Sequence, residues 1–500
     1  MTEETQSTLE ELIATRKEKL EQLRELGIKP YAYEYDVTHY AEQILNDYDK
    51  FAETVDVRLA GRLMSIRRMG KASFAHIQDS TGKIQIYVKV DNIGEQMYEA
   101  FKLLDIGDWI GVAGKVMKTR TGEITILTEE LSVLSKGLRP IPVVKETDDK
   151  VYDAFSDKEQ RYRQRYLDFI VNPEVKEVFK TRSAIIRNIR HFMDERGFIE
   201  VETPVLQPIY GGASARPFKT HHNTLDTDFY LRIADELYLK RLIVGGFEKV
   251  YEIAKDFRNE GMDRNHNPEF TMLEWYQAFV DYEHEMEMVE ALISEVAAKT
   301  GHAKIQFGEP EIDLTPPFAR KKMFELFEEY LGTDIKDYDR DELFDFATEQ
   351  GIEVDDDMNY GKILDSIFGD VVEPNLIRPT FVIDYPRAVS PLAKVKRDGD
   401  ERIVERFELI VAGMEMANAF SELNDPINQR ERLEQQAQLR SEGDDEAQVV
   451  DEDFLTAMEI GMPPTGGVGI GVDRLVMLLT NQHSIKDVIL FPQMRPQSDD

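Results

Sequence analysis

The chain has 500 residues and a formal net charge of −35, with 61 lysines and arginines against 96 aspartates and glutamates. This length exceeds one ordinary hydrophobic core, so two or three domains are expected, and 42% apolar residues exclude wholesale disorder. The absence of cysteine excludes disulfides, thiolate zinc sites, iron–sulfur clusters and a catalytic thiol.

The N-terminal segment predicts a helical extension over residues 1–56, which hold 6 basic and 14 acidic residues. Apolar residues at helical spacing indicate a helix over 8–26, with Thr8 and Glu11 as a capping box and Gly27 as its end. The segment lacks a signal-peptide core, and no run of about eighteen apolar residues follows. We therefore expect a cytoplasmic protein without a membrane span.

A basic, strand-rich segment follows at 57–140, with 13 basic and 9 acidic residues. Alternating apolar residues separated by turn signals predict five strands, at 57–66, 73–78, 83–90, 108–117 and 123–128. Five short strands in this length are typical of a small barrel of the oligonucleotide-binding (OB) type. The proline- and charge-bearing run that follows predicts a linker over 141–155.

A second domain is expected over residues 156–500, and it opens with a long helix and a strand. Residues 174–196 have the spacing of an amphipathic helix that ends before Gly197. The next segment, 198–206, predicts a strand, and its Pro204 suits an edge or an interface because proline cannot donate to a ladder.

The rest of this domain contains apolar strands without regular helical crossovers, which indicates a mostly antiparallel sheet flanked by helices. Helical spacing dominates a middle section at 284–300 and 320–370, and the run 441–453 predicts a solvated acidic loop. The predicted fold class is therefore α+β.

The strings FRNEG and RNHNPEF bring Arg258, Glu260 and His266 into one short stretch, 257–270. Turn-forming residues between the strings predict a hairpin loop that presents a guanidinium, an imidazole and a carboxylate to one site. Arginine binds phosphate or carboxylate in bidentate fashion. A surface salt-bridge ladder is the alternative.

The string RFELIVAGMEMANAFSELND, at 406–425, places Glu408, Glu415 and Glu422 among apolar residues. Buried carboxylates are costly unless they are paired or bound to a cation. Hard oxygen ligands, with Asn418 nearby, suit magnesium. The alternative is that these glutamates form the polar face of alternating strands.

The string TGGVGIGVDRLVML, at 465–478, is a glycine-rich turn that leads into a helix with Arg474 in its first turn. Its glycines let backbone approach a ligand closely. The string contains no Gly-Lys-Ser/Thr, which excludes a P-loop, and its spacing disfavours a dinucleotide-binding turn. Tight packing of strand on helix is the alternative.

Together these strings resemble the three signature motifs of class II aminoacyl-tRNA synthetases. The helix and strand that end near Pro204 match the first, dimer-forming motif, the Arg258 hairpin matches the second, and the Arg474 turn matches the third. The closer resemblance is to lysyl-tRNA synthetases, and it covers nearly the whole chain. The segments that carry it are RRMGKASF (67–74), RYRQRYLD (161–168), YGGASARPF (210–218), RIADELYLKRL (232–242) and NAFSELND (418–425). One departure is Asn265, because many bacterial members carry arginine just before the motif-two histidine.

The resemblance implies an OB-fold anticodon-binding barrel and a class II catalytic domain, which form a homodimer through the first motif. The implied reaction activates L-lysine with ATP and Mg²⁺, releases pyrophosphate and transfers the lysyl group to the 3′ end of tRNA-Lys. Arg258 would contact the α-phosphate and the substrate carboxylate, and Phe270 and Arg474 would enclose the adenine. A carboxylate beside a phenol hydroxyl also suits an ammonium on an aliphatic stem.

The resemblance implies the following roles. The catalytic residues are Arg258, Glu260, His266 and Arg474, and ATP binding adds Phe270 and Glu408. The magnesium ligands are Glu408 and Glu415. The lysine-binding residues are Gly212, Glu236, Arg258, Glu274, Tyr276, Asn418 and Glu422, and the anticodon-binding residues are Arg67, Phe74 and Gln85.

Three other functions are weighed against this one. An aspartyl- or asparaginyl-tRNA synthetase shares the layout, but an aspartate pocket needs a cation that faces the side chain, and here the candidates are acidic or phenolic. A lysyl transferase that modifies a protein would lack the barrel. A non-catalytic tRNA-binding protein would have lost Arg258, Arg474 or a metal glutamate, and all are present.

Overall fold

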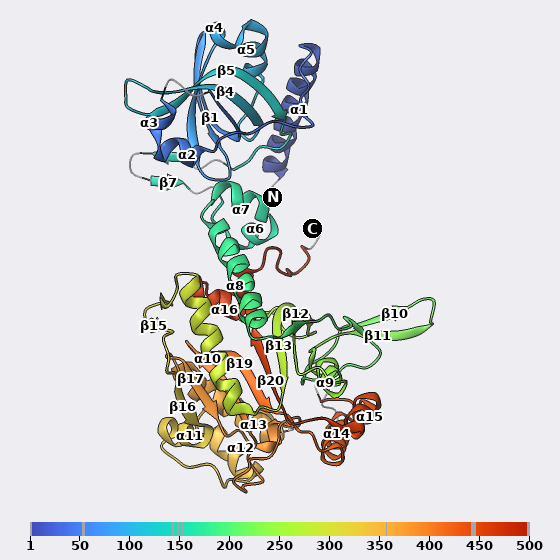
Figure 1. Cartoon of the computed structure of the whole chain (residues 1–500). Coiled ribbons are helices and arrows are strands. Elements are labelled where there is room, and N and C mark those ends of the chain that lie inside the picture. Colours follow the sequence, from blue (N-terminus) through green and yellow to red (C-terminus); the bar gives the residue numbers. More distant parts are fainter. Residues whose placement is uncertain are drawn as a thin grey trace. The chain divides into compact units, whose positions relative to one another are not determined.

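The computed structural model describes residues 3–52, 56–142, 145–147, 150–152, 155–356, 358–441 and 447–497. The chain forms two compact units, residues 1–157 and 158–500, which are drawn in Figure 1. Parts of the predicted linker and of the predicted acidic loop, including 442–446, lie outside the described residues. Among the residues described, no helix combines the length and the apolar character needed to cross a bilayer.

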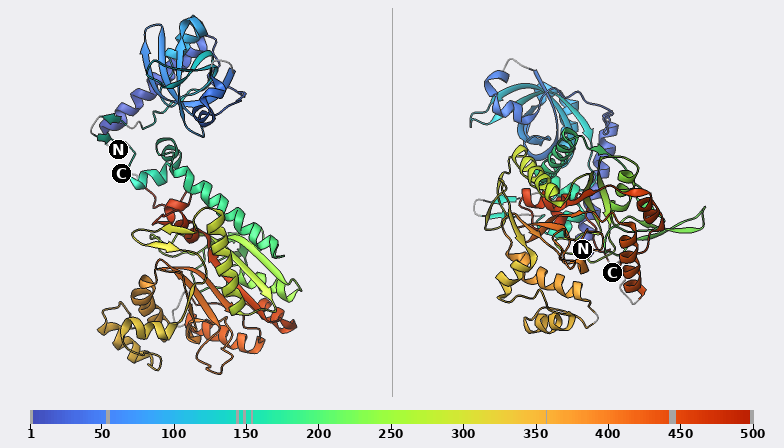
Figure 2. Two further views of the ribbon diagram at one scale, coloured as in Figure 1. Left: turned by 60° about the vertical axis from the view of Figure 1, so that its left-hand side comes forward. Right: turned by 60° about the horizontal axis from the view of Figure 1, so that its bottom comes forward.

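The first unit contains a closed five-stranded barrel with strand order β1-β2-β3-β5-β4, seen from two further sides in Figure 2. This confirms the predicted barrel. Its strands are β1 (Asp56–Met69), β2 (Ala72–Gln78), β3 (Lys83–Lys89), β4 (Trp109–Lys118) and β5 (Ile124–Ser135). Alternate residues such as Ala75 and Ile77 fill the interior, so the intervening residues of β2 face outward.

Helices cover parts of this barrel. Besides α1 (Glu3–Glu25) they are α2 (Ala41–Asn46), α3 (Tyr48–Phe51), α4 (Val90–Ile93) and α5 (Glu95–Lys102); a hairpin of β6 (Lys145–Thr147) and β7 (Lys150–Tyr152) follows. The predicted N-terminal helix is found, but it begins at Glu3, so the prediction that Thr8 caps it is wrong. Gly27 ends it at φ 75°, a conformation that glycine adopts easily. Arg16 donates to the carbonyls of Ile106, Gly137 and Arg139, which ties α1 to the barrel.

The second unit is built on an eight-stranded sheet with order β16-β17-β18-β19-β20-β13-β12-β8. The pairs are antiparallel except at the two edges, where β16 pairs with β17 and β12 with β8 in parallel. This confirms the predicted mostly antiparallel sheet. Its strands are β8 (Ile199–Glu200), β12 (Lys249–Phe257), β13 (Glu269–Ala278), β16 (Ala319–Lys322), β17 (Thr380–Ile383), β18 (Arg406–Val411), β19 (Met414–Ser421) and β20 (Thr465–Gly471).

One face of the sheet packs on helices α8 (Val175–Glu195), α10 (Tyr282–Lys299) and α16 (Val472–Leu479), and side chains from these helices share a single hydrophobic core with the sheet. Leu273 and Trp275 of β13 point into that core. Glu274 and Tyr276 alternate with them and therefore face the opposite side of the sheet. This alternation assigns the polar residues of the central strands to one surface.

The remaining elements surround this sheet (Figure 1). Helices α11 (Met323–Leu331), α12 (Arg340–Glu349) and α13 (Tyr360–Ile367) share a second core with β17 and β18, and a hairpin of β10 (Lys219–His222) and β11 (Thr227–Leu231) projects from the unit. The other elements are α6 (Lys158–Arg163), α7 (Arg165–Val171), β9 (Leu206–Gln207), α9 (Glu236–Val244), β14 (Lys304–Gln306), β15 (Glu311–Asp313), η1 (Phe368–Val372), η2 (Glu373–Asn375), η3 (Arg387–Val389), α14 (Pro426–Ser441), α15 (Glu452–Gly461) and α17 (Ile485–Val488).

The predicted strand over 198–206 is wrong in its length. Only Ile199–Glu200 pairs with β12, and Leu206–Gln207 belongs to a separate three-stranded sheet. Between them the backbone N–H of Thr203 donates to the carboxylate of Glu252 at 3.0 Å, so a side chain takes the place of a ladder partner. Pro204 then lies outside any strand, which agrees with its missing N–H.

Candidate active site

A cavity of about 460 Å³ opens on the sheet face opposite the main helical core. Every residue predicted to bind ATP, lysine or metal lines it. These residues are Gly212, Glu236, Arg258, Glu260, His266, Phe270, Glu274, Tyr276, Glu408, Glu415, Asn418, Glu422 and Arg474. The structure therefore brings together residues from well-separated parts of the chain.

Strand register arranges many of these residues in rows. One row crosses the neighbouring strands β13, β20, β19 and β18. Its members, in that order, are Glu274, Gly469, Asn418 and Glu408. A second row, two residues along, contains Tyr276, Gly467, Phe420 and Arg406. Because residues two apart on a strand share a face, both rows point toward the cavity.

The motif-two hairpin connects β12 to β13 by the loop 258–268, as its turn residues predict. The backbone N–H of Arg258 donates to the carbonyl of Pro268 at 2.9 Å, and its guanidinium lies 5.1 Å from the Phe270 ring centroid. The Asp263 carboxylate accepts the backbone N–H groups of Asn265 and His266, which shapes the loop tip. Asn265 also lines the cavity.

Arg474 connects the third motif to the other two. Its Nη1 donates to the backbone carbonyl of Glu415 at 2.7 Å and to the Glu415 carboxylate at 3.2 Å, and its Nη2 lies 3.3 Å from Nε2 of His266. The guanidinium is partly exposed and stands at the start of α16. It is therefore positioned for an anionic ligand in the cavity.

Glu408 is held by three donors. Tyr385 donates to Oε2 at 2.8 Å, Arg406 to Oε1 at 2.6 Å, and Asn418 to Oε1 at 3.4 Å. Burial, together with the negative charge of Glu415, nevertheless raises the pKa of Glu408 to about 7. Two carboxylates that face one cavity suit a hard divalent cation, which would offset the repulsion between their charges.

Asp365 is a further cavity residue, which the sequence reasoning missed. Its side chain keeps exposed surface, yet desolvation by the surrounding protein raises its pKa to about 6; Arg406 opposes this shift and the charge of Glu415 adds to it. It comes from α13, outside the recognised motifs. No local pattern marked this aspartate, because α13 reads as an ordinary amphipathic helix.

Lys240 is the second residue that the sequence reasoning missed. It is fully buried on α9, and its Nζ lies 2.6 Å from Oε2 of Glu422 and also pairs with Glu236. Burial raises the pKa of Glu422 to about 8, although Lys240 opposes this shift. Lys240 is not among the residues that line the cavity, so it neutralises the pocket carboxylates from behind.

The absence of a side chain at Gly467 leaves space in the pocket for Glu422 and Tyr276. A Cβ on this residue would lie 2.1 Å from Oε1 of Glu422 and 2.4 Å from Cε1 of Tyr276. Glu422 Oε1 has no hydrogen-bond partner within the described part of the chain. Oε1 of Glu422 and the Tyr276 ring therefore both lie so close to Gly467 that any larger residue at this position would clash with them.

The predicted anticodon residues lie on the outer face of the barrel in the first unit. Arg67, Phe74 and Tyr87 are opposite one another on β1, β2 and β3, and the Phe74 and Tyr87 rings stack at 4.3 Å between centroids. Gln85 lies in the adjacent row, where its amide donates to Glu123 at 2.6 Å and its carbonyl accepts from Thr125.

Two further contacts shape this surface. Ser73, which precedes Phe74 on β2, is buried and bonds to the Tyr98 hydroxyl at 3.0 Å. Glu123, the residue before β5, contacts both Gln85 and His76. The sequence does not single it out, because one glutamate next to a strand carries no local feature of such a contact.

Two family models match the chain. One, described as tRNA synthetases class II (D, K and N), matches residues 157–495, and an OB-fold nucleic acid binding domain matches residues 57–134. The lysine–tRNA ligase of Pelotomaculum thermopropionicum is 55% identical over 493 residues, which cover 98% of this chain and 96% of that protein. The lysine–tRNA ligase of Moorella thermoacetica is 52% identical over 491 residues, covering 98% of this chain and 99% of that protein.

Proposed function

The chain belongs to the lysine–tRNA ligase family of class II tRNA synthetases, and from this membership we propose that it activates L-lysine with ATP and charges tRNA-Lys in the cytoplasm. The observation that carries the proposal is that one cavity collects all of the residues predicted to bind ATP, lysine or metal. It presents carboxylates and a phenol at one end, and arginines beside a carboxylate pair at the other.

In the first step the lysine carboxylate oxygen attacks the α-phosphorus of ATP, and the bond to the leaving pyrophosphate breaks. In the second, a hydroxyl of the terminal tRNA adenosine attacks the carbonyl carbon of lysyl-adenylate, and AMP leaves. Neither step needs a nucleophile from the protein, so positioning and charge neutralisation carry the catalysis.

Arg258 is assigned to the α-phosphate and the lysine carboxylate, which places it between the two reactants. Its guanidinium lies over the ring of Phe270, and Phe270 is assigned to the adenine. Arg474 and His266 contact each other at the cavity wall and are assigned to the adenine and the terminal phosphates. Glu260, exposed on the same loop, is assigned to the nucleotide.

Glu408 and Glu415 are assigned to Mg²⁺. The raised pKa of Glu408 supports this role, because the negative charge of Glu415 opposes the ionisation of Glu408 and a bound cation would offset that repulsion. The two carboxylates would hold the cation, which would supply neutralisation of the charge that develops on the pyrophosphate. Arg406 and Tyr385 hold Glu408 in place with short hydrogen bonds.

The lysine side chain is assigned to the pocket formed by Glu274, Tyr276 and Glu422. The α-amino group of lysine is assigned to Gly212 and Glu236. Asn418 is also assigned to lysine binding, and all three residues line the cavity. The Tyr276 hydroxyl donates to Glu274 at 3.4 Å, and Glu422 keeps Oε1 for the substrate. An uncharged side chain would leave that oxygen desolvated and unpaired, so the pocket would reject it.

Aspartate and asparagine remain the alternative substrates within the same class. Lys240 is a cation in contact with the acidic wall, but two glutamates already bind it, and it does not line the cavity. An aspartate side chain would therefore face carboxylates. The charge of the pocket favours lysine over both alternatives.

The barrel is assigned to the anticodon. Phe74 is partly exposed beside exposed Arg67, so a base can stack on the aromatic row while the guanidinium reaches a base edge or phosphate. Gln85 already uses both ends of its amide. Reading a base would therefore require Gln85 to exchange one of these bonds.

A homodimer is assigned to the first motif. Four apolar side chains of this segment are exposed, namely Ile199, Val205, Leu206 and Ile209, and a second copy of the chain would cover them. Leu206→Asp should shift the molar mass in light scattering toward that of one chain. Ile460→Asp, at an exposed apolar residue elsewhere, should leave the mass unchanged.

ATP–pyrophosphate exchange with each of the twenty amino acids, in Mg²⁺ and without tRNA, tests the function. Exchange with lysine alone is the expected result. Exchange with aspartate or asparagine instead would overturn the pocket assignment, and no exchange with any amino acid would overturn the activation step.

A further inference from the structure

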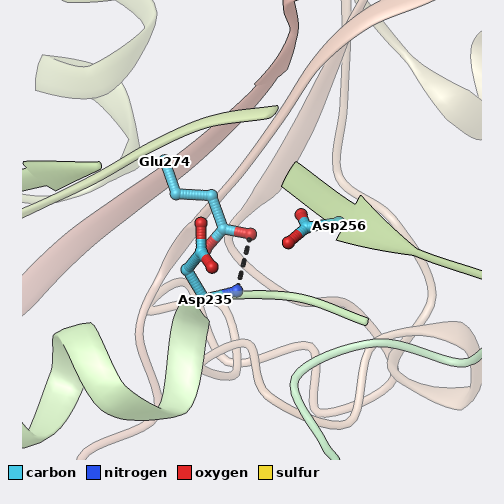
Figure 3. A group of neighbouring side chains, drawn as sticks. All are labelled: Asp235, Asp256 and Glu274. Atoms are coloured by element: carbon cyan, nitrogen blue, oxygen red, sulfur yellow. Dashed lines mark hydrogen bonds between the residues drawn. The ribbon is translucent and has the colours of Figure 1, made fainter. Parts of the chain in front are cut away.

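A cluster of three buried carboxylates lies beside the lysine pocket, shown in Figure 3. Asp235 precedes α9, Asp256 lies near the end of β12, and Glu274 comes from β13. One oxygen of each lies within 4.8 Å of the others. Asp235 and Asp256 have no exposed surface, whereas Glu274 lines the cavity.

The cluster has more negative than positive charge around it. Arg232 serves three carboxylates, because its guanidinium lies 3.0 Å from Asp235, 2.7 Å from Glu252 and 3.5 Å from Asp256. Arg258 is the other guanidinium whose field reaches Asp256 and Glu274. Four carboxylates thus face two guanidinium groups, and buried charge without a partner is strongly unfavourable.

Two buried carboxylates of the cluster accept no hydrogen bond. Neither oxygen of Asp235 or of Asp256 has a hydrogen-bond partner among the described residues, and Arg232 contacts each carboxylate as an ion pair only. Asp235 stands at the N-cap of α9, where aspartate commonly accepts a backbone N–H, yet its side chain makes no capping bond. Its carboxylate is turned toward the cluster instead.

We propose that Asp235, Asp256 and Glu274 bind a divalent cation that prefers oxygen ligands, Mg²⁺ in the cell, at a site separate from the ATP metal. Three carboxylate oxygens at this spacing are a suitable ligand set for a hard cation. Glu274 connects the site to the cavity and gives the ion an entry path.

Protons are the other means of neutralising such a cluster. Two protonated carboxyls would donate hydrogen bonds to their neighbours, but in the described structure the cluster has no hydrogen bond between its side chains. The one bond within it runs from the backbone N–H of Asp235 to Glu274 at 3.3 Å. The oxygens are therefore arranged as ligands around a shared point.

The cation would also support the lysine pocket. It would fix Glu274 and the first residue of α9, the helix that carries Glu236 and Lys240. This second consequence rests on the proposed function, whereas binding of the cation does not. The site can therefore be tested without the enzymatic reaction.

The test uses Mn²⁺ binding to the full chain without ATP, followed by electron paramagnetic resonance of free Mn²⁺. We expect one ATP-independent site, which the double variant D235N/D256N weakens at least tenfold and the double variant E408Q/E415Q retains. Binding that persists in D235N/D256N, or its absence from the unaltered chain, would overturn the proposal.

Thermal unfolding provides a second measurement that separates ligand loss from misfolding. Without metal, D235N/D256N should unfold at or above the temperature of the unaltered chain, because two buried charges have been removed. Mn²⁺ should raise the unfolding temperature of the unaltered chain but not of the variant. An equal rise in both would overturn the site, whatever the result of the lysine exchange assay.

Discussion

The ammonium of Lys240 lies 2.6 Å from the carboxylate of Glu422, and neither side chain has exposed surface. The protein thus keeps an ammonium of its own beside the carboxylate assigned to the ammonium of the substrate. Burial raises the pKa of Glu422 to about 8 even with Lys240 present. A second ammonium, on the bound lysine, would favour the ionised form of Glu422. Lysine binding and the ionisation of Glu422 are therefore linked.

Glu422→Gln should weaken lysine binding far more than ATP binding. Loss of one partner of a buried charge pair costs about 2–5 kcal/mol, roughly thirtyfold to several thousandfold in affinity. The KM values for lysine and ATP in pyrophosphate exchange measure the two effects separately. Equal losses for both substrates would contradict the assignment of Glu422 to lysine.

Lys240→Met should destabilise the second unit as well as impair lysine binding. The change leaves Glu236 and Glu422 buried without their common counter-charge, which costs about 3–5 kcal/mol. Urea unfolding, followed by tryptophan fluorescence, measures the loss. Lys486→Met is the control, because its ammonium forms no ion pair within the described part of the chain, and it should change the unfolding free energy little.

Gly467→Ala should abolish lysine activation, because the new Cβ would lie 2.1 Å from Glu422 and 2.4 Å from Tyr276. Gly369→Ala is a control in the same unit, since its Cβ would meet no atom within 4 Å and the residue does not line the cavity. Exchange rates of the two variants give the comparison. Similar activity in both would show that the pocket does not depend on the room at Gly467.

Phe74→Ala should leave pyrophosphate exchange unchanged and weaken tRNA charging. Stacking of a base on an aromatic ring contributes about 1–3 kcal/mol, so the KM for tRNA should rise roughly fivefold to a hundredfold. Tyr33→Ala, at a fully exposed tyrosine of the same unit, serves as the control. A lower exchange rate in Phe74→Ala would indicate a structural role for this ring.

Glu285→Gln should reduce the pH dependence of stability. Burial raises the pKa of Glu285 from 4.5 to about 8, although Trp275 opposes this with a hydrogen bond from Nε1 at 2.8 Å. Between these pH values the folded state binds a proton that the unfolded state has released. The stability present below pH 4.5 is therefore lost as pH rises through about 8, at up to about 1.4 kcal/mol per pH unit.

Urea unfolding at pH 5, 6.5 and 8 measures this slope. Glutamine retains an acceptor for Trp275, so the variant should lose the proton uptake without losing the hydrogen bond. An identical slope in both proteins would show that Glu285 is ionised throughout this range.

Much of the fold follows from local sequence. Alternation and turn residues predicted the barrel strands, and helical spacing predicted α8. The short helix α5 was missed, although Tyr98 and Phe101 have helical spacing, because it lies in a connection between two strands. The strand over 198–206 was predicted too long because a local pattern cannot show that Glu252 accepts the N–H of Thr203.

Site residues that lie in sequence motifs were predicted. Site residues whose role depends on contacts between distant segments were missed. Arg258, Glu408 and Arg474 lie in recognisable strings. Lys240 lies four residues after Glu236 on a helix, and only the folded chain shows that it also meets Glu422. A sequence contains no direct record of such a contact between distant segments.

The row from Glu274 through Gly469 and Asn418 to Glu408 crosses four neighbouring strands. Three strand intervals of roughly 4.8 Å separate its ends by about 14 Å. Backbone hydrogen bonds fix that length, and side-chain rotamers do not change it. Side-chain substitutions can thus alter the strength of binding at either end, whereas only a slipped register or an inserted residue would change the length of the molecule that fits between them.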